Sequence, residues 1–343
     1  MVTSHPSNGF TEFISSRCGS KRIAFEGVEQ LSGFELPFEV EAFEVDHSIY
    51  GANAYVLHCD VDVAYTGDFR LHGRNADKTK KFVRKARSSR VLIIEGTRTE
   101  REDVNESEDE VFRNCLEAVE NARGLVIADF SSRNFERLET FVKIAKKTGR
   151  ELVITAKEAY MLHAMECADG NCRMDDNIRI YYELKDRTRC KWETEIVMER
   201  WGEKYVDPEE ISGNQEQFIL CFSFYDLKHL LDIKPEGGAY IYSSSEAFTE
   251  EQEFDFLRLH NWLKHFGFEI YGFEMGFDGR RPRPRFIRGY HASGHASKSD
   301  LEKVIQEIDP DVIIPVHTAN PSWFLENFEG VVVLRDGESC TID

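Results

Sequence analysis

Five residues that could carry metal-ion or acid–base chemistry occur where predicted β-strands end. They are His47, Asp68, Glu95, His295 and His317. In α/β folds the carboxyl ends of the strands form the edge at which ligands and metals bind, and imidazole and carboxylate groups are common zinc ligands. The five residues lie far apart in the sequence. We therefore expect them to act together only if the fold gathers them.

The composition is that of a globular protein, and the length of 343 residues suggests two domains. Hydrophobic residues make up 41% of the chain, which is ample for packed cores. No run of about 18 apolar residues predicts a transmembrane helix, and the N-terminal residues do not resemble a signal peptide. The eight cysteines are not spaced as in a small disulfide-rich domain. We therefore expect reduced thiols and a cytoplasmic location.

The formal net charge of −19 argues against a general nucleic-acid-binding surface. Contact with RNA would then depend on local basic patches. One candidate is the run Arg-Arg-Pro-Arg-Pro-Arg at residues 280–285. It could contact phosphates or form a solvated linker stiffened by proline, and the sequence leaves both interpretations open.

The predicted secondary structure divides the chain into three stretches. Residues 23–70 are β-rich, and the acidic run at 100–110 forms a boundary after a strand at 91–94. From there to about residue 278 strands and helices alternate, which predicts a mostly parallel sheet with helices on its faces. Residues 286–343 return to strand, helix, strand and strand, expected at 286–291, 297–308, 312–316 and 331–334.

The motifs around the five residues resemble the β-CASP family of the metallo-β-lactamase superfamily, RNA-processing nucleases similar to ribonuclease J and to the cleavage and polyadenylation endonuclease. They read DHSIYGA (His47), YTGDFRLHG (Asp68), VLIIEGTRTE (Glu95), HASGHAS (His295) and IIPVH (His317). The resemblance implies an α/β fold: an αβ/βα sandwich, here N-terminally incomplete, with an inserted β-CASP domain. It implies domains at 1–103 and 104–278, and a C-terminal return at 279–343.

The resemblance also implies a catalytic site with two zinc ions. His47 would bind one ion, Asp68 would bridge both, and His317 would bind the other. Glu95 and His295 would pair beside the scissile phosphate, with His295 as general acid or charge stabiliser. The family's His-x-His-x-Asp-His motif is absent from this sequence, which leaves about two ligands per ion where zinc requires three or four.

The function implied is metal-dependent hydrolysis of RNA phosphodiesters, as an exo- or endoribonuclease. Because the ligand set is incomplete, we expect the isolated chain to bind zinc weakly and to be inactive without a missing N-terminal segment. The alternative is an inactive β-CASP protein that binds RNA or pairs with an active paralogue. Expected partners are therefore RNA, the missing segment, a second copy or such a paralogue, and no membrane.

A second group of residues is expected to bind RNA phosphates: Ser131, Ser132, Asn134, Arg137 and His291. The first three lie at a predicted strand-to-helix turn, where hydroxyl groups and free backbone N–H groups favour phosphate. The same residues could simply cap the helix, and the two roles are compatible. Arg137 belongs to a segment that resembles a family motif, and His291 could face the cleft or pack.

Overall fold

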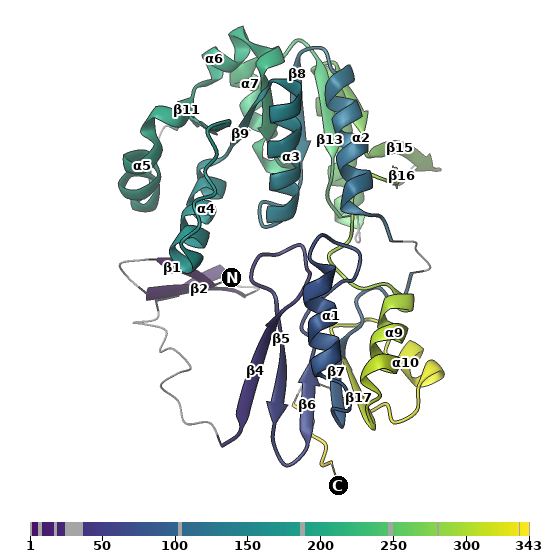
Figure 1. Ribbon diagram of the computed structural model, residues 1–343. Helices are drawn as coiled ribbons and strands as arrows, with labels where there is room; N and C mark the ends of the chain where they lie inside the picture. The colour runs from purple at the N-terminus through teal and green to yellow at the C-terminus, as the bar shows by residue number, and fades with distance from the viewer. Residues whose placement is uncertain are drawn as a thin grey trace.

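The computed structural model describes residues 2–5, 9–16, 19–24, 37–101, 105–185, 189–245, 250–279, 281–335 and 337–342. Two α/β domains lie one above the other, joined at a waist (Figure 1). The sheet of the lower domain draws strands from both ends of the described chain, and the sheet of the upper domain lies between them in sequence. The expected boundary at residues 103 and 104 falls on residues outside the described ranges.

The lower domain is built on a five-stranded sheet with the order β17-β7-β6-β5-β4. Its strands are β4 (Glu39–Glu44), β5 (Asn53–His58), β6 (Asp62–Tyr65), β7 (Val91–Glu95) and β17 (Val312–Val316). β6, β7 and β17 are parallel, so their carboxyl ends meet at one edge. The edge faces the waist (Figure 1). Glu95 is the last residue of β7, and Asp68 and His317 lie in the segments that follow β6 and β17.

Three helices share a core with this sheet: α1 (Ala76–Lys85), α9 (Lys298–Ile308) and α10 (Ser322–Asn327). α9 begins at Ser297, whose hydroxyl accepts a hydrogen bond from the backbone N–H of Asp300. Such a cap stabilises a helix start by about 1 kcal/mol. Leu301 and Ile305 then face Leu92 and Ile94 in the core. The loop that carries His295 is therefore anchored by the packed helix that follows it.

The upper domain is built on a seven-stranded parallel sheet with the order β11-β10-β9-β12-β8-β13-β14. Its strands are β8 (Leu125–Asp129), β9 (Glu151–Ile154), β10 (Ile178–Tyr181), β11 (Tyr205–Val206), β12 (Phe218–Cys221), β13 (Gly238–Tyr242) and β14 (Phe268–Tyr271). The strands are short apolar runs because both faces of the sheet are buried.

Each face of the upper sheet has its own core. One core contains side chains of α2 (Glu108–Asn121), α3 (Phe135–Thr148) and α4 (Ala156–Asp169). The other contains side chains of α6 (Pro208–Gly213), α7 (Leu230–Ile233) and α8 (Glu250–His265). Ile127 and Ala128, neighbours on β8, belong to opposite cores, as the alternation of side chains along a strand requires.

Shorter elements complete the described chain. They are β1 (Val2–His5), β2 (Gly9–Ser16) and β3 (Gly19–Ala24), which form an antiparallel sheet, a π-helix at Glu193–Met198, α5 (Glu199–Trp201), the 3₁₀ helices Gly202–Lys204, Gln215–Gln217 and η5 (Phe224–His229), and the hairpin of β15 (Phe273–Asp278) and β16 (Arg281–Phe286). Within the described ranges, no helix combines the length and apolar character needed to cross a membrane.

The structure differs from three interpretations in the last part of the described chain. Residues 281–286 form strand β16, paired with β15, so this part of the Arg-Pro run is not a linker, and the strand expected at 286–291 ends at Phe286. Arg281 and Arg283 bind Glu253 at 2.7 and 3.1 Å, so the run is held by ion pairs. The strand expected at 331–334 is reduced to one bridge, between Val331 and Ile313.

Candidate metal centre

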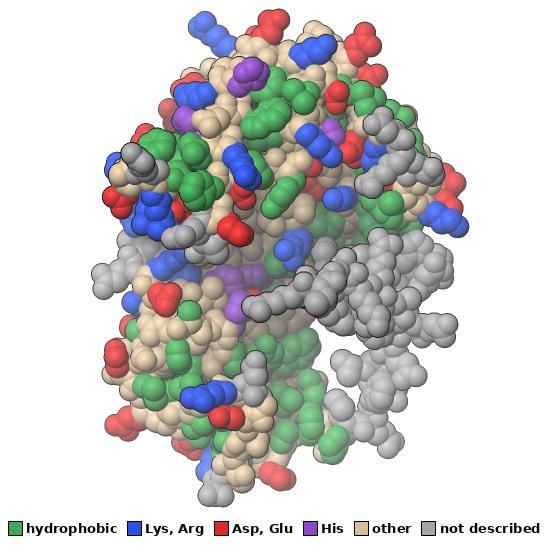
Figure 2. All heavy atoms as spheres, turned by 180° about the vertical axis from the view of Figure 1, so that it is seen from behind, with side chains coloured by type: hydrophobic (Ala, Val, Ile, Leu, Met, Phe, Trp, Pro, Cys, Tyr) green, Lys and Arg blue, Asp and Glu red, His purple; other side chains and the backbone are tan. Residues whose placement is uncertain are grey.

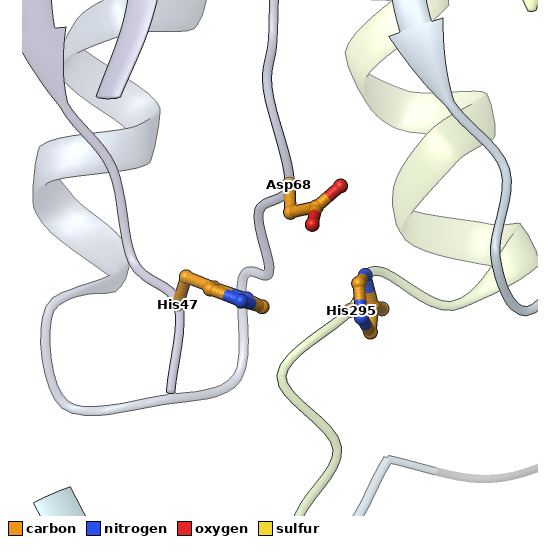
Figure 3. Close-up of side chains that lie close together, drawn as sticks. All are labelled: His47, Asp68 and His295. Carbon is orange, nitrogen blue, oxygen red and sulfur yellow. The ribbon is translucent and has the colours of Figure 1, made fainter. Parts of the chain in front are cut away.

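Three of the predicted residues meet at the waist: His47, Asp68 and His295. One possible ligand atom from each lies within 4.8 Å of the other two (Figure 3). They come from the loop after β4, the loop after β6 and the loop before α9, and their side chains point toward a common space. Figure 2 shows histidine side chains gathered in the hollow between the two halves of the molecule. Two imidazoles and a carboxylate are a donor set typical of zinc.

His317 joins this group through Asp68. Its Nδ1 lies 2.8 Å from Asp68 Oδ1, and its ring centroid lies 5.5 Å from that of His295. His317 follows β17 with a φ of 49°, in the left-handed region that is uncommon for residues other than glycine. Strained backbone of this kind persists where the surroundings fix it, often at functional sites. His317 thus lies where the motif predicts, but as a partner of Asp68 outside the three-residue group.

The loop before α9 orients the imidazole of His47. The carbonyl oxygen of Gly294 lies 2.6 Å from His47 Nδ1 and accepts a hydrogen bond from its N–H, which leaves Nε2 free to bind a metal ion. Burial lowers the pKa of His47, and the Gly294 hydrogen bond only partly opposes this effect. The ring is therefore held in its neutral form. A Cβ at residue 294 would lie 2.8 Å from His47 Cε1, so only glycine permits this approach.

Glu95 orients the imidazole of His295 through a hydrogen bond. Its Oε1 lies 3.2 Å from His295 Nδ1, and the backbone N–H of Thr97 donates to Oε2 at 3.0 Å. Glu95 is almost fully buried. Burial alone would raise its pKa and lower that of His295, but their mutual hydrogen bond and charges outweigh burial. The pKa of Glu95 is lowered and that of His295 is raised. His295 Nδ1 is thereby engaged, and its Nε2 remains available.

A network of buried charges lies behind the metal-binding loops, and we name it the ion network: Asp46, Arg70, Glu108, Glu136 and Arg137. Arg70 is fully buried and binds Asp46 and Glu108 at 3.1 and 3.2 Å, and also Glu136. Arg137 binds Glu108 at 3.1 Å. Asp46 and Arg70 belong to the lower domain, and the other three belong to α2 and α3 of the upper domain. The network therefore ties the domains together directly behind His47 and Asp68.

The sequence did not identify this network. Arg70 is neither a phosphate contact nor a surface ion-pair partner, since its guanidinium group is fully buried. The available signals were local: Asp46 directly precedes His47, and Arg70 lies two residues after Asp68. The backbone N–H of Arg70 also donates to the carbonyl of Asp46 at 2.8 Å, which binds the two loops together.

The residues expected to bind RNA phosphates differ in their exposure and in their partners. Arg137 does not fit that role, because it is fully buried and bound to Glu108. His291 does not fit it either as a cation, because burial and then the charge of Arg137 lower its pKa to about 3. Asn134 caps α3, accepting a hydrogen bond from the N–H of Arg137 at 3.0 Å. Ser131 and Ser132 remain exposed at the start of α3.

Comparison with known proteins agrees with this geometry. Residues 283–322, which include His291, His295 and His317, match the model of the Zn-dependent metallo-hydrolase RNA specificity domain. The chain is 30% identical to ribonuclease J of Sinorhizobium meliloti over 88% of its length and 51% of that protein. It is 23% identical to ribonuclease J of Thermus thermophilus, over 84% of this chain and 48% of that one.

A solved structure shows the same fold. The chain matches a protein of unknown function from Enterococcus faecalis V583 with a TM-score of 0.66 and 23% identity, over 91% of this chain and 66% of that one. The chain spans about half the length of the two ribonucleases above. Its matched domain, its similarity to these proteins and its five motifs agree on one assignment. The chain belongs to the β-CASP family of the metallo-β-lactamase superfamily.

Proposed function

We propose that this chain is an RNA-processing, metal-dependent phosphodiester hydrolase. The observation that carries the proposal is the convergence of His47, Asp68 and His295, with donor atoms within 4.8 Å of one another, at the waist between two domains. The matched RNA specificity domain and the similarity to proteins named ribonuclease J support RNA as the substrate.

The three side chains fit a divalent zinc ion. His47 is neutral, with Nε2 free, and His295 has Nδ1 engaged by a carboxylate, which is the arrangement of most zinc-binding histidines. A bound zinc ion would supply Lewis-acid activation of water and stabilise negative charge on the phosphate. The sequence alone assigned about two ligands to each of two ions. Because His295 joins the group, we propose that His47, Asp68 and His295 would hold one ion, whereas a second ion would need ligands beyond Asp68 and His317.

Glu95 is proposed as a positioning residue rather than a ligand. Its carboxylate is enclosed and aims at His295 Nδ1, away from the cleft. Glu95 therefore sets the tautomer and the ring orientation of His295. When no ion occupies Nε2, the raised pKa of His295 favours a protonated ring, which can donate a hydrogen bond to a phosphate oxygen or a proton to the leaving oxygen.

The proposal is tested with a labelled single-stranded RNA and the purified chain, with zinc and after chelation. The ligand count from the sequence predicted an inactive isolated chain, but His295 adds a third ligand to the cluster. We therefore propose, in place of that expectation, cleavage that needs the ion, that is lost in Asp68→Ala and that is retained in Asp62→Ala. The second variant is a matched control, because Asp62 also pairs with a histidine, His58, at 3.0 Å, but at the far end of β6. A chain that binds zinc at the cluster and leaves RNA uncut would contradict the proposal.

The comparisons lend no support to the alternative of an inactive RNA-binding partner, since the curated relatives named above are ribonucleases. Association with a second copy, with an active paralogue or with a further N-terminal segment stays a prediction. It is tested by measuring the molar mass of the purified chain in solution, where a mass above 39.7 kDa would indicate self-association.

A further inference from the structure

The loop that precedes α9, residues 291–297, carries His295 and contains no helix or strand. Backbone carbonyls inside a protein need hydrogen-bond donors, and in this loop side chains of the lower domain supply them. Three successive carbonyls accept such hydrogen bonds, those of Ser293, Gly294 and His295. The donors are His47, Arg70, His72 and Arg98. The first two are a proposed ligand and a member of the ion network, whereas the last two have no role in either.

His72 holds the first of these carbonyls. Its Nε2 lies 2.9 Å from Ser293 O, and because a carbonyl oxygen only accepts, Nε2 carries the proton. The other ring nitrogen, Nδ1, lies 3.9 Å from a carboxylate oxygen of Asp300, in the first turn of α9. The imidazole side chain is 9% exposed. His72 therefore contacts both the loop and the helix that follows it.

Arg98 holds the third carbonyl, and it is 6% exposed. Its Nη1 donates to His295 O at 3.1 Å and to Asn105 Oδ1 at 2.9 Å. The amide of Asn105 in turn donates to Ser297 Oγ, the cap of α9, at 3.1 Å. Arg98 is thus bonded to the backbone of His295 directly and to the start of α9 through Asn105.

The middle carbonyl orients a proposed ligand. Gly294 O accepts the hydrogen bond that orients His47, and the next residue along the chain is His295. A displacement of the loop would therefore move both imidazoles relative to Asp68 (Figure 3). Histidine nitrogens bind zinc at about 2.0–2.1 Å, so a loop shift of about 1 Å would break a Zn–N contact.

We propose that His72 and Arg98 are positioning residues of the metal centre, which hold the Ser293 and His295 carbonyls on either side of Gly294 and thereby place two imidazoles for one ion. These roles rest on the proposed function, since without a metal centre the loop has no ligands to position. Glu95 orients the ring of His295, whereas Arg98 orients its backbone.

The test is zinc titration of the chelator-treated full chain, together with denaturant unfolding of each variant without metal. His72→Phe and Arg98→Met keep the bulk of each side chain and remove its donors. We expect each to weaken zinc binding about 10- to 100-fold, the range of residues that orient metal ligands. His72→Gln, whose amide places an N–H group near the position of Nε2, should bind zinc almost as the wild type does. Arg87→Met is the matched control, because Arg87 also pairs with α9, at Glu307, but at the end of the helix far from His295.

The two measurements separate positioning from structural support. A structural role alone would lower the free energy of unfolding of the metal-free variants and leave their zinc affinity unchanged, and this result would overturn the proposal. If His72→Phe or Arg98→Met does not fold, the shorter polar variants His72→Asn and Arg98→Gln are judged by the same two measurements.

Asp68→Ala distinguishes a failure of the positioning roles from a failure of the metal centre. If Asp68→Ala weakens zinc binding and the variants of His72 and Arg98 do not, only the positioning roles fail. If the wild type binds no zinc, or binds it as tightly as Asp68→Ala does, the metal centre fails and the positioning roles fail with it.

Discussion

The metal cluster and the ion network lie next to each other, are built from charged and ionisable side chains, and differ in how those charges are balanced. In the ion network, Arg70 and Arg137 form ion pairs with three buried carboxylates inside the protein, although Asp46 Oδ2 and Arg137 Nε have no hydrogen-bond partner among the described residues. In the metal cluster, two imidazoles and one carboxylate bring possible ligand atoms within 4.8 Å of one another. Charged groups that pair with one another indicate a structural role. Ligand atoms that converge on one point indicate a binding site.

The pKa directions follow the same division. Burial raises the pKa of Glu108, but the charges of Arg137 and Arg70 outweigh burial and lower it. Glu136 is the surplus carboxylate, and its pKa is raised by burial even though Arg70 opposes that effect. The charges of Arg137 and Arg70 therefore favour the ionised form of Glu108 without a metal ion.

The largest stability effect should follow from opening the ion network. Arg70→Met leaves Asp46, Glu108 and Glu136 without their shared cation, and we expect a loss of about 3–5 kcal/mol in the free energy of unfolding. Arg74→Met is the control, because Arg74 is partly exposed and contacts only the outer side of the network. Denaturant unfolding measures both variants. A loss below about 1 kcal/mol for Arg70→Met would mean that the network is not structural.

Glu95→Gln tests whether Glu95 supports the metal cluster rather than the fold. The amide has the shape of the carboxylate but no charge, so His295 would lose the anionic partner that strengthens its Nδ1 hydrogen bond and raises its pKa. We expect the rate of RNA cleavage to fall about 10- to 100-fold, as for other residues that orient metal ligands. Circular dichroism should show an unchanged fold. Cleavage at the wild-type rate would exclude this role for Glu95.

Asp129 is a third case: its carboxyl group is buried and has no cationic partner among the described residues. Burial, partly opposed by the hydrogen bond from Tyr240, raises its pKa from 3.8 to about 7 in the folded chain. Between these values the folded state binds more protons than the unfolded state, so Asp129 makes stability fall as pH rises. Asp129→Asn removes this term. Its free energy of unfolding relative to the wild type should increase from pH 4 to 7 and then stay level.

The smallest expected change in stability tests whether the residues before α3 cap the helix or are exposed and free to bind phosphate. Asn134→Ala removes the helix cap and should cost about 1 kcal/mol of stability. Ser132→Ala, two residues earlier and exposed, should cost less than about 0.5 kcal/mol. Equal losses for the two variants, measured by thermal unfolding, would show that the cap contributes nothing specific.

The sequence predicted that Asp68 and His317 lie at the carboxyl edge of the sheet because each follows a predicted strand. Val312–Val316 is a β-branched run, and His317 comes directly after it. The place of His295 depends instead on the path of the 291–297 loop over Glu95, which no periodicity encodes. The Arg-Pro strand was also missed, because proline usually argues against strands and only the edge position of β16 permits it.

The ion network could not be predicted for a different reason. Charged side chains are almost never fully buried, so composition and spacing assign Arg70 and Glu108 to the surface. Their burial follows from the docking of the upper domain on the lower one. Such docking brings together residues that are 38 positions apart, as Arg70 and Glu108 are.

The central claim is that His47, Asp68 and His295 form a metal centre, and zinc titration of the chelator-treated chain tests it most directly. We expect one ion bound per chain in the wild type and in Asp62→Ala. Asp68→Ala should weaken binding by more than about 100-fold, beyond what a residue that only orients a ligand contributes. If Asp68→Ala binds zinc as tightly as the wild type does, the cluster is not the metal centre.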